Sequence, residues 1–239
     1  MLDLPTLTYA FLGGLLPALV WLYFWLKEDA RCPEPKHLIF LAFVAGMIAV
    51  PLVIPFQKFA LAHYGEISLM TIFAWAAVEE LMKYGVVAVA ILWRKAVNEP
   101  IDAMIYMVTA ALGFAALENT LFLLSPIADG NLIDSFITGN LRFLGSTLLH
   151  LFASAIVGFA MAISFYKHKR LMPLYTSIGL ILAIALHTIF NLLIISSKGY
   201  NTLNAFFFVW VGVVVILILF EVARVIRFKN RPKNKGRNC

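Results

Sequence analysis

The chain has 239 residues, of which 62% are hydrophobic and 13% are charged. Soluble domains average about 45–50% apolar and about 25% charged residues, so this composition excludes a mainly soluble protein and indicates an integral membrane protein. The net charge of +6 does not indicate nucleic-acid binding, because the surplus Lys and Arg residues lie in loops and in a basic tail. There the anionic lipid of the bilayer is the simpler partner.

Seven stretches of the chain are long and apolar enough to cross a bilayer, which takes about 20 mostly apolar residues in a helix. They cover residues 5–26, 38–57, 68–93, 101–124, 141–166, 172–196 and 203–222. Helices are expected because a backbone in lipid must satisfy its hydrogen bonds internally. The sequence therefore predicts an all-α, polytopic, multi-pass bundle of about seven transmembrane helices in the cell membrane. Residues 1–223 form the transmembrane domain, and residues 224–239 form a basic cytoplasmic tail.

Basic residues predict the orientation of the bundle. Most Lys and Arg residues outside the spans lie in the first, third and fifth loops and in the tail. Because such residues stay on the cytoplasmic side, we expect the N-terminus outside and the C-terminus in the cytoplasm. Cys32 and Cys239 would then both face the reducing side as free thiols. The longest outer loop is predicted at residues 125–140, with apolar residues that could lie on the membrane interface or cover a site.

Six ionisable side chains interrupt the apolar spans, at an insertion cost of at least ~2.5–3.5 kcal/mol each, and such residues usually mark a functional site. They are Glu79, Glu80, Lys83, Glu118, His150 and His187. At 1.5 Å per helical residue, the carboxylates and histidines lie roughly 9–16 Å below the outer ends of four different spans. We therefore expect one buried cluster around water in the outer half of the membrane.

The adjacent carboxylates of the third span should have different roles. Glu79 and Glu80 point about 100° apart on a helix, and Lys83 is within reach of either as a supporting residue. One carboxylate is then expected to work while the other is held by Lys83. The structural alternative is an ion pair that only locks helices together.

The later spans add an acid, two imidazoles and two amides. Glu118 precedes Asn119, a supporting residue, and a purely structural polar pair is the alternative for these two. His187 and Asn191 are four residues apart on one helix face, which Gly179 continues toward the cytoplasm so that another helix can approach closely. The amide of Asn191 could link helices or donate a hydrogen bond to an oxyanion. Outside this group, Asp102 is interpreted as a helix-start residue.

Two hydrolytic chemistries fit these residue types. In the favoured one, no cofactor is needed, and Glu79 (or Glu80) acts directly on water as a general base. In the other, His150, His187 and Glu80 bind zinc and another glutamate is the base. Each helix supplies one histidine, unlike the H-E-x-x-H motif, so the spacing leaves both open. A proton-coupled transporter is a further alternative, since the same groups could form a relay.

In order along the chain, four motifs resemble those of the PrsW family of intramembrane proteases. They are Glu79-Glu80-x-x-Lys83, the segment 113–119 (GFAALEN), His150 with Gly158, and His187-x-x-x-Asn191. The resemblance covers roughly residues 68–196, the motif-bearing core. The family is grouped with the type II CAAX prenyl endopeptidases and with the multipass scaffold subunit of gamma-secretase.

The resemblance implies hydrolysis of a peptide bond in a membrane-protein substrate, such as a single-pass anti-sigma-factor-like protein. It implies that Glu79 activates the water, that His150 helps to hold it, and that His187 with Asn191 faces the developing oxyanion. Lys83 stands where the CAAX group has arginine, and Glu118-Asn119 replaces a histidine motif, so prenyl-peptide specificity is not implied. The scaffold relative leaves a non-catalytic membrane scaffold or binding subunit as an alternative.

Overall fold

The structure is a computed structural model that describes residues 3–27, 33–65, 68–196 and 202–230. These residues form helices and no strand. The helices are α1 (Leu4–Leu26), α2 (Lys36–Tyr64), α3 (Leu69–Val87), α4 (Pro100–Ala128), α5 (Leu132–Leu141), α6 (Thr147–Ser164), α7 (Met172–Ser196) and α8 (Thr202–Asn230). Two π-helical turns, η2 (Ala88–Leu92) and η3 (Arg142–Ser146), extend α3 and join α5 to α6, and a 3₁₀ turn, η4 (Lys169–Leu171), precedes α7.

The predicted all-α membrane bundle is confirmed. Within the described ranges, six helical segments are long and apolar enough to cross a membrane: α1, α2, α4, the continuous segment Leu132–Ser164, α7 and α8. Helix α3 with η2 has a similar length and carries the three charged residues of the third predicted span. The orientation of the termini and the division at residue 223 stay predictions. Cys32, Cys239 and tail residues 231–239 lie outside the described residues.

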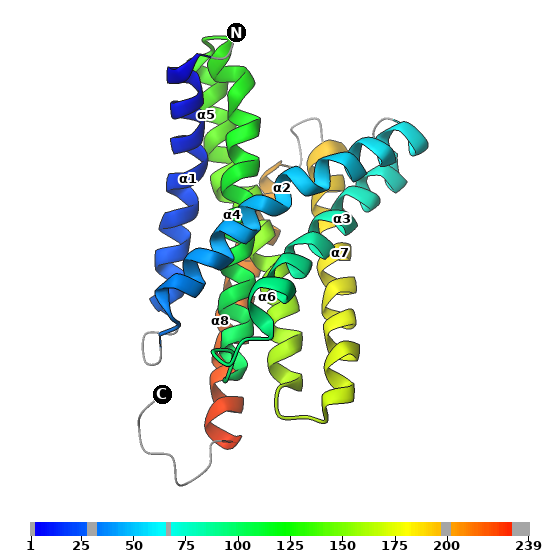
Figure 1. The fold of residues 1–239 in the computed structure, drawn as a ribbon. Coiled ribbons are helices and arrows are strands. Elements are labelled where there is room, and N and C mark those ends of the chain that lie inside the picture. The colour runs from blue at the N-terminus through cyan, green and yellow to red at the C-terminus, as the bar shows by residue number, and fades with distance from the viewer. Residues whose placement is uncertain (1–2, 28–32, 66–67, 197–201, 231–239) are drawn as a thin grey trace.

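Helix α4 is the axis of the bundle, and most of its residues are buried. Helices α1, α2 and α6 pack against it, with α2 crossing it obliquely (Figure 1). Each of the three reaches α4 through a glycine, where a Cβ atom would lie far inside contact distance of α4. The distances would be 2.3 Å from Gly14 to Ala116 O, 1.9 Å from Gly46 to Ala110 O, and 2.6 Å from Gly158 to Met104 Cα. Small residues thus let the backbones approach closely, as in other membrane bundles. The close approach expected at Gly179 is also confirmed, because a Cβ atom there would lie 2.7 Å from the Cβ atom of Ala160.

Three predicted boundaries were wrong, and all concern helices that continue further than expected. Helix α8 runs to Asn230, beyond the predicted end at 222. Helix α2 runs through both of its prolines to Tyr64, beyond the predicted end at 57. The predicted outer loop at residues 125–140 is mostly helical, because α4 continues through Pro126 and α5 begins at Leu132. The turn between them, at residues 129–131, uses Gly130 at φ +68°, and the Asn131 side chain caps α5.

Helix α4 starts in a polar cluster at the end of the bundle opposite its Glu118 end. Asp102 accepts hydrogen bonds from the backbone N–H groups of Asn98 (2.8 Å) and Glu99 (2.7 Å), which confirms its helix-start role. Glu99 also pairs with Arg227 of α8 at 2.7 Å, and Tyr106 donates a hydrogen bond to Glu34. Burial raises the pKa of the Glu34 carboxyl. These contacts tie α4 to α8 and to the segment before α2.

We expect Gly113→Ala to destabilise the bundle, because its Cβ would lie 1.9 Å from the backbone oxygen of Phe43. Overpacking of this kind typically costs about 1–3 kcal/mol. Gly85→Ala is the matched control, since a Cβ there has no neighbour within 4 Å. Thermal unfolding of the two variants in detergent should show a lower midpoint for Gly113→Ala only. Equal midpoints would contradict the close α2–α4 contact.

Candidate active site

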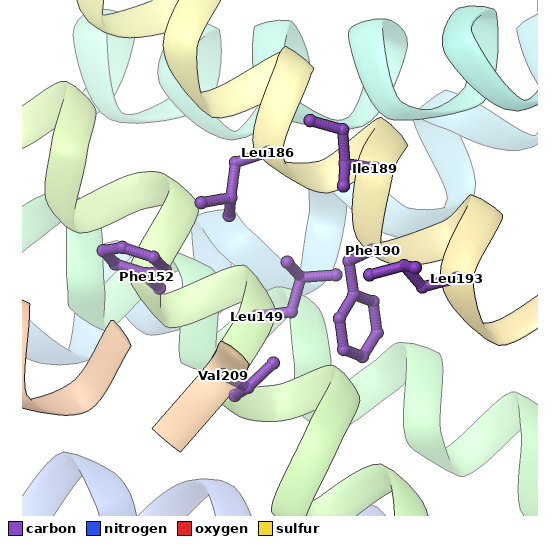
Figure 2. A pocket seen from close by; sticks show the side chains of 7 residues that line it. All are labelled: Leu149, Phe152, Leu186, Ile189, Phe190, Leu193 and Val209. Carbon is purple, nitrogen blue, oxygen red and sulfur yellow. The ribbon is translucent and has the colours of Figure 1, made fainter. Parts of the chain in front are cut away.

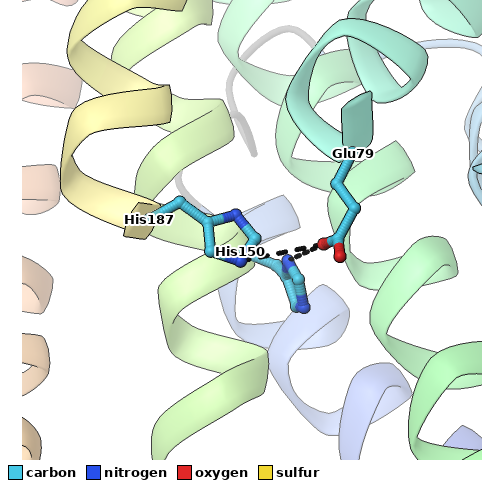
Figure 3. A group of neighbouring side chains, drawn as sticks. All are labelled: Glu79, His150 and His187. Atoms are coloured by element: carbon cyan, nitrogen blue, oxygen red, sulfur yellow. Dashed lines mark ion pairs between the residues drawn. The ribbon is translucent and has the colours of Figure 1, made fainter. Parts of the chain in front are cut away.

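The ionisable residues of four helices meet inside the bundle, as the sequence predicted. Helix α3 contributes the Glu79, Glu80 and Lys83 side chains, and α4, α6 and α7 contribute Glu118, His150 and His187. All except Glu118 are at most 5% exposed, whereas the Glu118 side chain is 17% exposed. Figure 3 shows Glu79 facing both imidazoles from the opposite side of the cluster. The convergence is confirmed, and the catalytic roles stay predictions.

Glu80 is the carboxylate that Lys83 holds. The Lys83 Nζ atom lies 2.5 Å from Glu80 Oε1, and it also lies 3.0 Å from His150 Nδ1. The same Glu80 oxygen lies 2.8 Å from His187 Nδ1. Since Lys83 is 0% exposed, its charge needs this partner, and the pair fixes Glu80 as an ionic support.

Glu79 is placed differently from its neighbour. Its Oε1 atom accepts a hydrogen bond of 2.8 Å from Gln57 Nε2. Its Oε2 atom is buried and has no hydrogen-bond partner in the described part of the chain. This oxygen lies 3.7 Å from His187 Nε2 and 3.9 Å from His150 Nδ1. A buried acceptor without a partner costs free energy, so the arrangement indicates a position for a further group between Glu79 and the imidazoles.

Two carboxylates orient the imidazoles. Glu80 contacts the Nδ1 atom of His187 at 2.8 Å, and Glu118 Oε2 contacts the Nε2 atom of His150 at 3.0 Å. Because an ionised carboxylate only accepts hydrogen bonds, each imidazole donates its N–H there. The other nitrogen of each neutral ring is then an acceptor and faces Glu79 Oε2. Such carboxylate–histidine pairs are typical of metal-binding histidines.

Glu79, His150 and His187 fit a metal ion in donor type and burial, and nearly in spacing. One donor atom from each residue lies within 4.8 Å of the other two. Zinc binds nitrogen and carboxylate oxygen at about 2.0–2.2 Å in a tetrahedron, which places donors roughly 3.4 Å apart. The unpartnered Glu79 oxygen lies 3.7 and 3.9 Å from the two acceptor nitrogens, so the three donors are spaced slightly wider than a bound zinc ion requires. Lys83 also opposes a bound ion, because its amino group contacts the same His150 Nδ1 atom at 3.0 Å.

The structure differs from the predicted metal set of His150, His187 and Glu80. It groups the histidines with Glu79 instead. The reason is that Glu80 Oε1 is engaged by Lys83 and by the far nitrogen of His187. The two glutamates are adjacent in sequence, and only the fold decides which of them faces both rings.

A family model described as PrsW family intramembrane metalloprotease matches residues 34–220. The chain belongs to the PrsW family. It is 26% identical over 216 residues to Protease PrsW of Oceanobacillus iheyensis, covering 89% of this chain and 94% of that protein. It is 29% identical over 194 residues to Protease PrsW of Geobacillus kaustophilus, covering 79% and 81%, and 23% identical to that of Bacillus subtilis, covering 83% and 89%. No solved structure gives a significant match. PrsW-family membership supports a membrane protease function and implies a protein substrate in the membrane.

Sequence reasoning missed two residues that contact this PrsW-family site. Gln57 lay at the predicted end of the second span and Arg142 at the start of the fifth, where contact with water is the ordinary expectation. In the structure, Gln57 binds Glu79, and its own backbone oxygen accepts a hydrogen bond of 2.9 Å from Trp75 Nε1. Arg142 donates hydrogen bonds to Glu118 and Asn119.

Both predicted amides lie near the cluster, in different situations. Asn119 is buried, accepts a hydrogen bond of 2.6 Å from Arg142 Nε, and donates one of 2.9 Å to Thr147 Oγ1. This supports its predicted role as a supporting residue. Asn191 is half-buried one helical turn after His187, and its side chain makes no hydrogen bond to residues in the described ranges. Its role at an oxyanion stays a prediction.

A separate apolar cavity of about 310 Å³ lies on the other side of α6 and α7 (Figure 2). Its walls include Leu149, Leu186 and Val209, the last from α8. Leu149 and Leu186 directly precede the two histidines, so their side chains point about 100° away from them. The cavity is therefore on the α8 side, the imidazoles face α3, and the seven cavity-lining residues carry no polar side chain.

We expect Lys83→Met to destabilise the protein strongly, because it leaves the Glu80 carboxylate buried without its cation. Breaking a buried ion pair typically costs about 3–5 kcal/mol. Adding Glu80→Gln should recover most of the loss, since the uncompensated charge is then removed. Lys58→Met, at an exposed position of α2, is the control. Thermal unfolding in detergent measures all four proteins, and equal midpoints for the two lysine variants would refute the pairing.

Proposed function

We propose that this chain is an intramembrane endopeptidase whose hydrolytic centre is formed by Glu79, His150 and His187. The observation that carries this proposal is the buried, unpartnered Glu79 Oε2 atom, which faces an acceptor nitrogen on each of two imidazoles. Buried polar atoms without a hydrogen-bond partner are rare, so this oxygen supports a position for a further group beside the imidazoles. The proteases among its relatives support the same reaction class. The proposed substrate is a membrane-spanning protein, with single-pass anti-sigma-factor-like proteins as the first candidates.

We further propose that the three residues hold a divalent metal, with zinc as the first candidate. This replaces the metal-free mechanism favoured by the sequence alone, and the donor geometry and the family description support it. Zinc in such a site supplies Lewis-acid chemistry, which activates water and polarises a carbonyl.

The surrounding residues then have separate tasks. Glu80 Oε2 is buried without a partner among the described residues, while Lys83 holds this carboxylate in place. Glu118 and Glu80 orient the two imidazoles. The amide of Asn191, one turn from His187 and without a competing hydrogen bond in the described part of α7, can donate to the substrate carbonyl oxygen as charge develops on it.

A metal-free glutamic mechanism is the second candidate, and one observation favours it. The Lys83 amino group lies 3.0 Å from His150 Nδ1, so it uses the lone pair that a metal would need. In this mechanism Glu79 Oε2 takes the proton of a water directly, and the imidazoles orient that water.

The proposed activity predicts that Glu79→Gln and His187→Ala abolish cleavage of a tagged single-pass membrane protein co-expressed with this chain. Removing a general base or its partner typically costs about 10²–10⁴ in rate. Glu221→Gln is the matched control, because Glu221 is an exposed glutamate of α8 that pairs only locally with Arg224 in the described structure. Immunoblots of the tag report the fragments. Fragments that persist in both site variants would exclude this centre.

The metal proposal predicts about one zinc ion per purified wild-type chain. Glu79→Gln and His187→Ala should lose the zinc because each removes one of three ligands, while Glu221→Gln should keep it. Elemental analysis by mass spectrometry gives the stoichiometry, and a strong chelator should stop cleavage. Full activity of metal-free wild-type protein would instead establish the glutamic mechanism.

A further inference from the structure

Arg142 lies in the π-helical turn η3, between α5 and α6, and its guanidinium is held by groups on two helices. Its Nη2 atom donates to Glu118 Oε2 and to Ser146 Oγ, the latter at 3.1 Å. Its Nε atom donates to Asn119 Oδ1 at 2.6 Å. The guanidinium carbon also lies 3.8 Å from the centre of the Phe122 ring. The Arg142 side chain is only 16% exposed.

The contact with Glu118 connects Arg142 to the hydrolytic centre. Glu118 Oε2 is shared between Arg142 on one side and His150 Nε2, at 3.0 Å, on the other. The carboxylate therefore cannot turn away from His150 without breaking its bond to the guanidinium. While Glu118 stays in place, the Nε2–H group of His150 is held toward it, and Nδ1, which the Lys83 amino group contacts at 3.0 Å, stays the acceptor that faces Glu79.

The local backbone places Arg142 for this contact. Arg142, Ser146 and His150 follow one another at intervals of four residues along one continuous helical segment, Leu132–Ser164. The π turn lies between the first two of them, and such turns occur frequently at functional sites. A guanidinium presents several donors in a rigid plane, and here two of its nitrogens bind three acceptors. The ammonium group of lysine could not reproduce this fixed arrangement.

We propose that Arg142 is a positioning residue of the proteolytic site, which acts through Glu118 to fix the His150 imidazole with its proton on Nε2. The inference rests on the proposed function for its catalytic consequence, and on the hydrogen-bond geometry alone for the orientation of the ring. Arg142 does not touch the reacting atoms.

The first test is the Nε2–H group of His150, read by NMR of protein with nitrogen-labelled histidine, with the His150 signals assigned by their loss in His150→Ala. The wild type should show the Nε2–H form. Arg142→Ala and Arg142→Lys should both keep this tautomer, because the Lys83 amino group still contacts Nδ1 at 3.0 Å. The Nε2–H signal should weaken and exchange faster with water in both variants, because neither supplies the planar donor pair that holds Glu118 against the ring. Arg224→Lys, which alters a half-buried arginine of α8 that pairs with Glu221, is the matched control and should keep the wild-type spectrum. Unchanged spectra in both Arg142 variants would overturn the proposal.

The second test separates positioning from folding and from the proposed function itself. In the cleavage assay, both Arg142 variants should lower kcat about 10–100-fold, as is usual when the partner of a site histidine is disturbed, with KM and the unfolding midpoint close to wild type. Arg142→Lys keeps charge and bulk, so it remains informative if Arg142→Ala fails to fold. A normal kcat for Arg142→Lys beside an inactive Glu79→Gln would overturn the positioning role while the proposed function stands. If the wild type cleaves nothing, the proposed function fails, and the Nε2–H signal of His150 still decides whether Arg142 orients the ring.

Discussion

The Lys83 ammonium is the charge around which the site is built. It is fully buried on a membrane-length helix, where an unpaired charge is prohibitive, and it is bound by Glu80 at 2.5 Å. An ion pair in such a place needs good geometry and further hydrogen bonds to be tolerated. His187 and His150 complete it, and in doing so they are drawn to α3 from two other helices. The constraint that stabilises the pair therefore also assembles the imidazoles.

The two adjacent glutamates of α3 have different contacts and therefore different roles. Glu80 is engaged by Lys83 and His187. Glu79 points about 100° away on α3, and a neutral amide, Gln57, binds one of its oxygens. The second oxygen is left facing the acceptor nitrogens of both rings. A neutral donor leaves the charge of Glu79 uncompensated, which favours a metal cation or a proton at that position. The same contacts thus serve either chemistry, and the lysine beside His150 is the feature that separates them.

Hydropathy alone was sufficient to predict the bundle, because every backbone group in lipid must be bonded within its own helix. The cost of burying charge likewise identified the residues that meet at the site, from Glu79 to His187. The sequence could not predict how each helix is rotated about its axis or where each helix ends. Whether Glu79 or Glu80 faces the histidines depends on a turn of about 100°, which hydropathy does not record. Gln57 was missed because α2 continues past the prolines that suggested its end. Arg142 was missed because the helical segment that carries it begins at Leu132, ahead of the predicted start of the fifth span at residue 141.

The two residues that sequence reasoning missed, Gln57 and Arg142, both lie at the partly exposed edge of the site. Lys83, Glu80 and the histidines are sealed within the bundle, while Gln57, Glu118 and Arg142 keep partial contact with the surroundings. Water and a peptide must approach from a side that is not sealed, and the apolar cavity on the α8 side offers no polar group to conduct either. Approach is therefore favoured along the rim that carries Gln57 on one helix and Arg142 with Glu118 on two others. The residues that orient Glu79 and His150 therefore lie at the boundary between the sealed cluster and its surroundings.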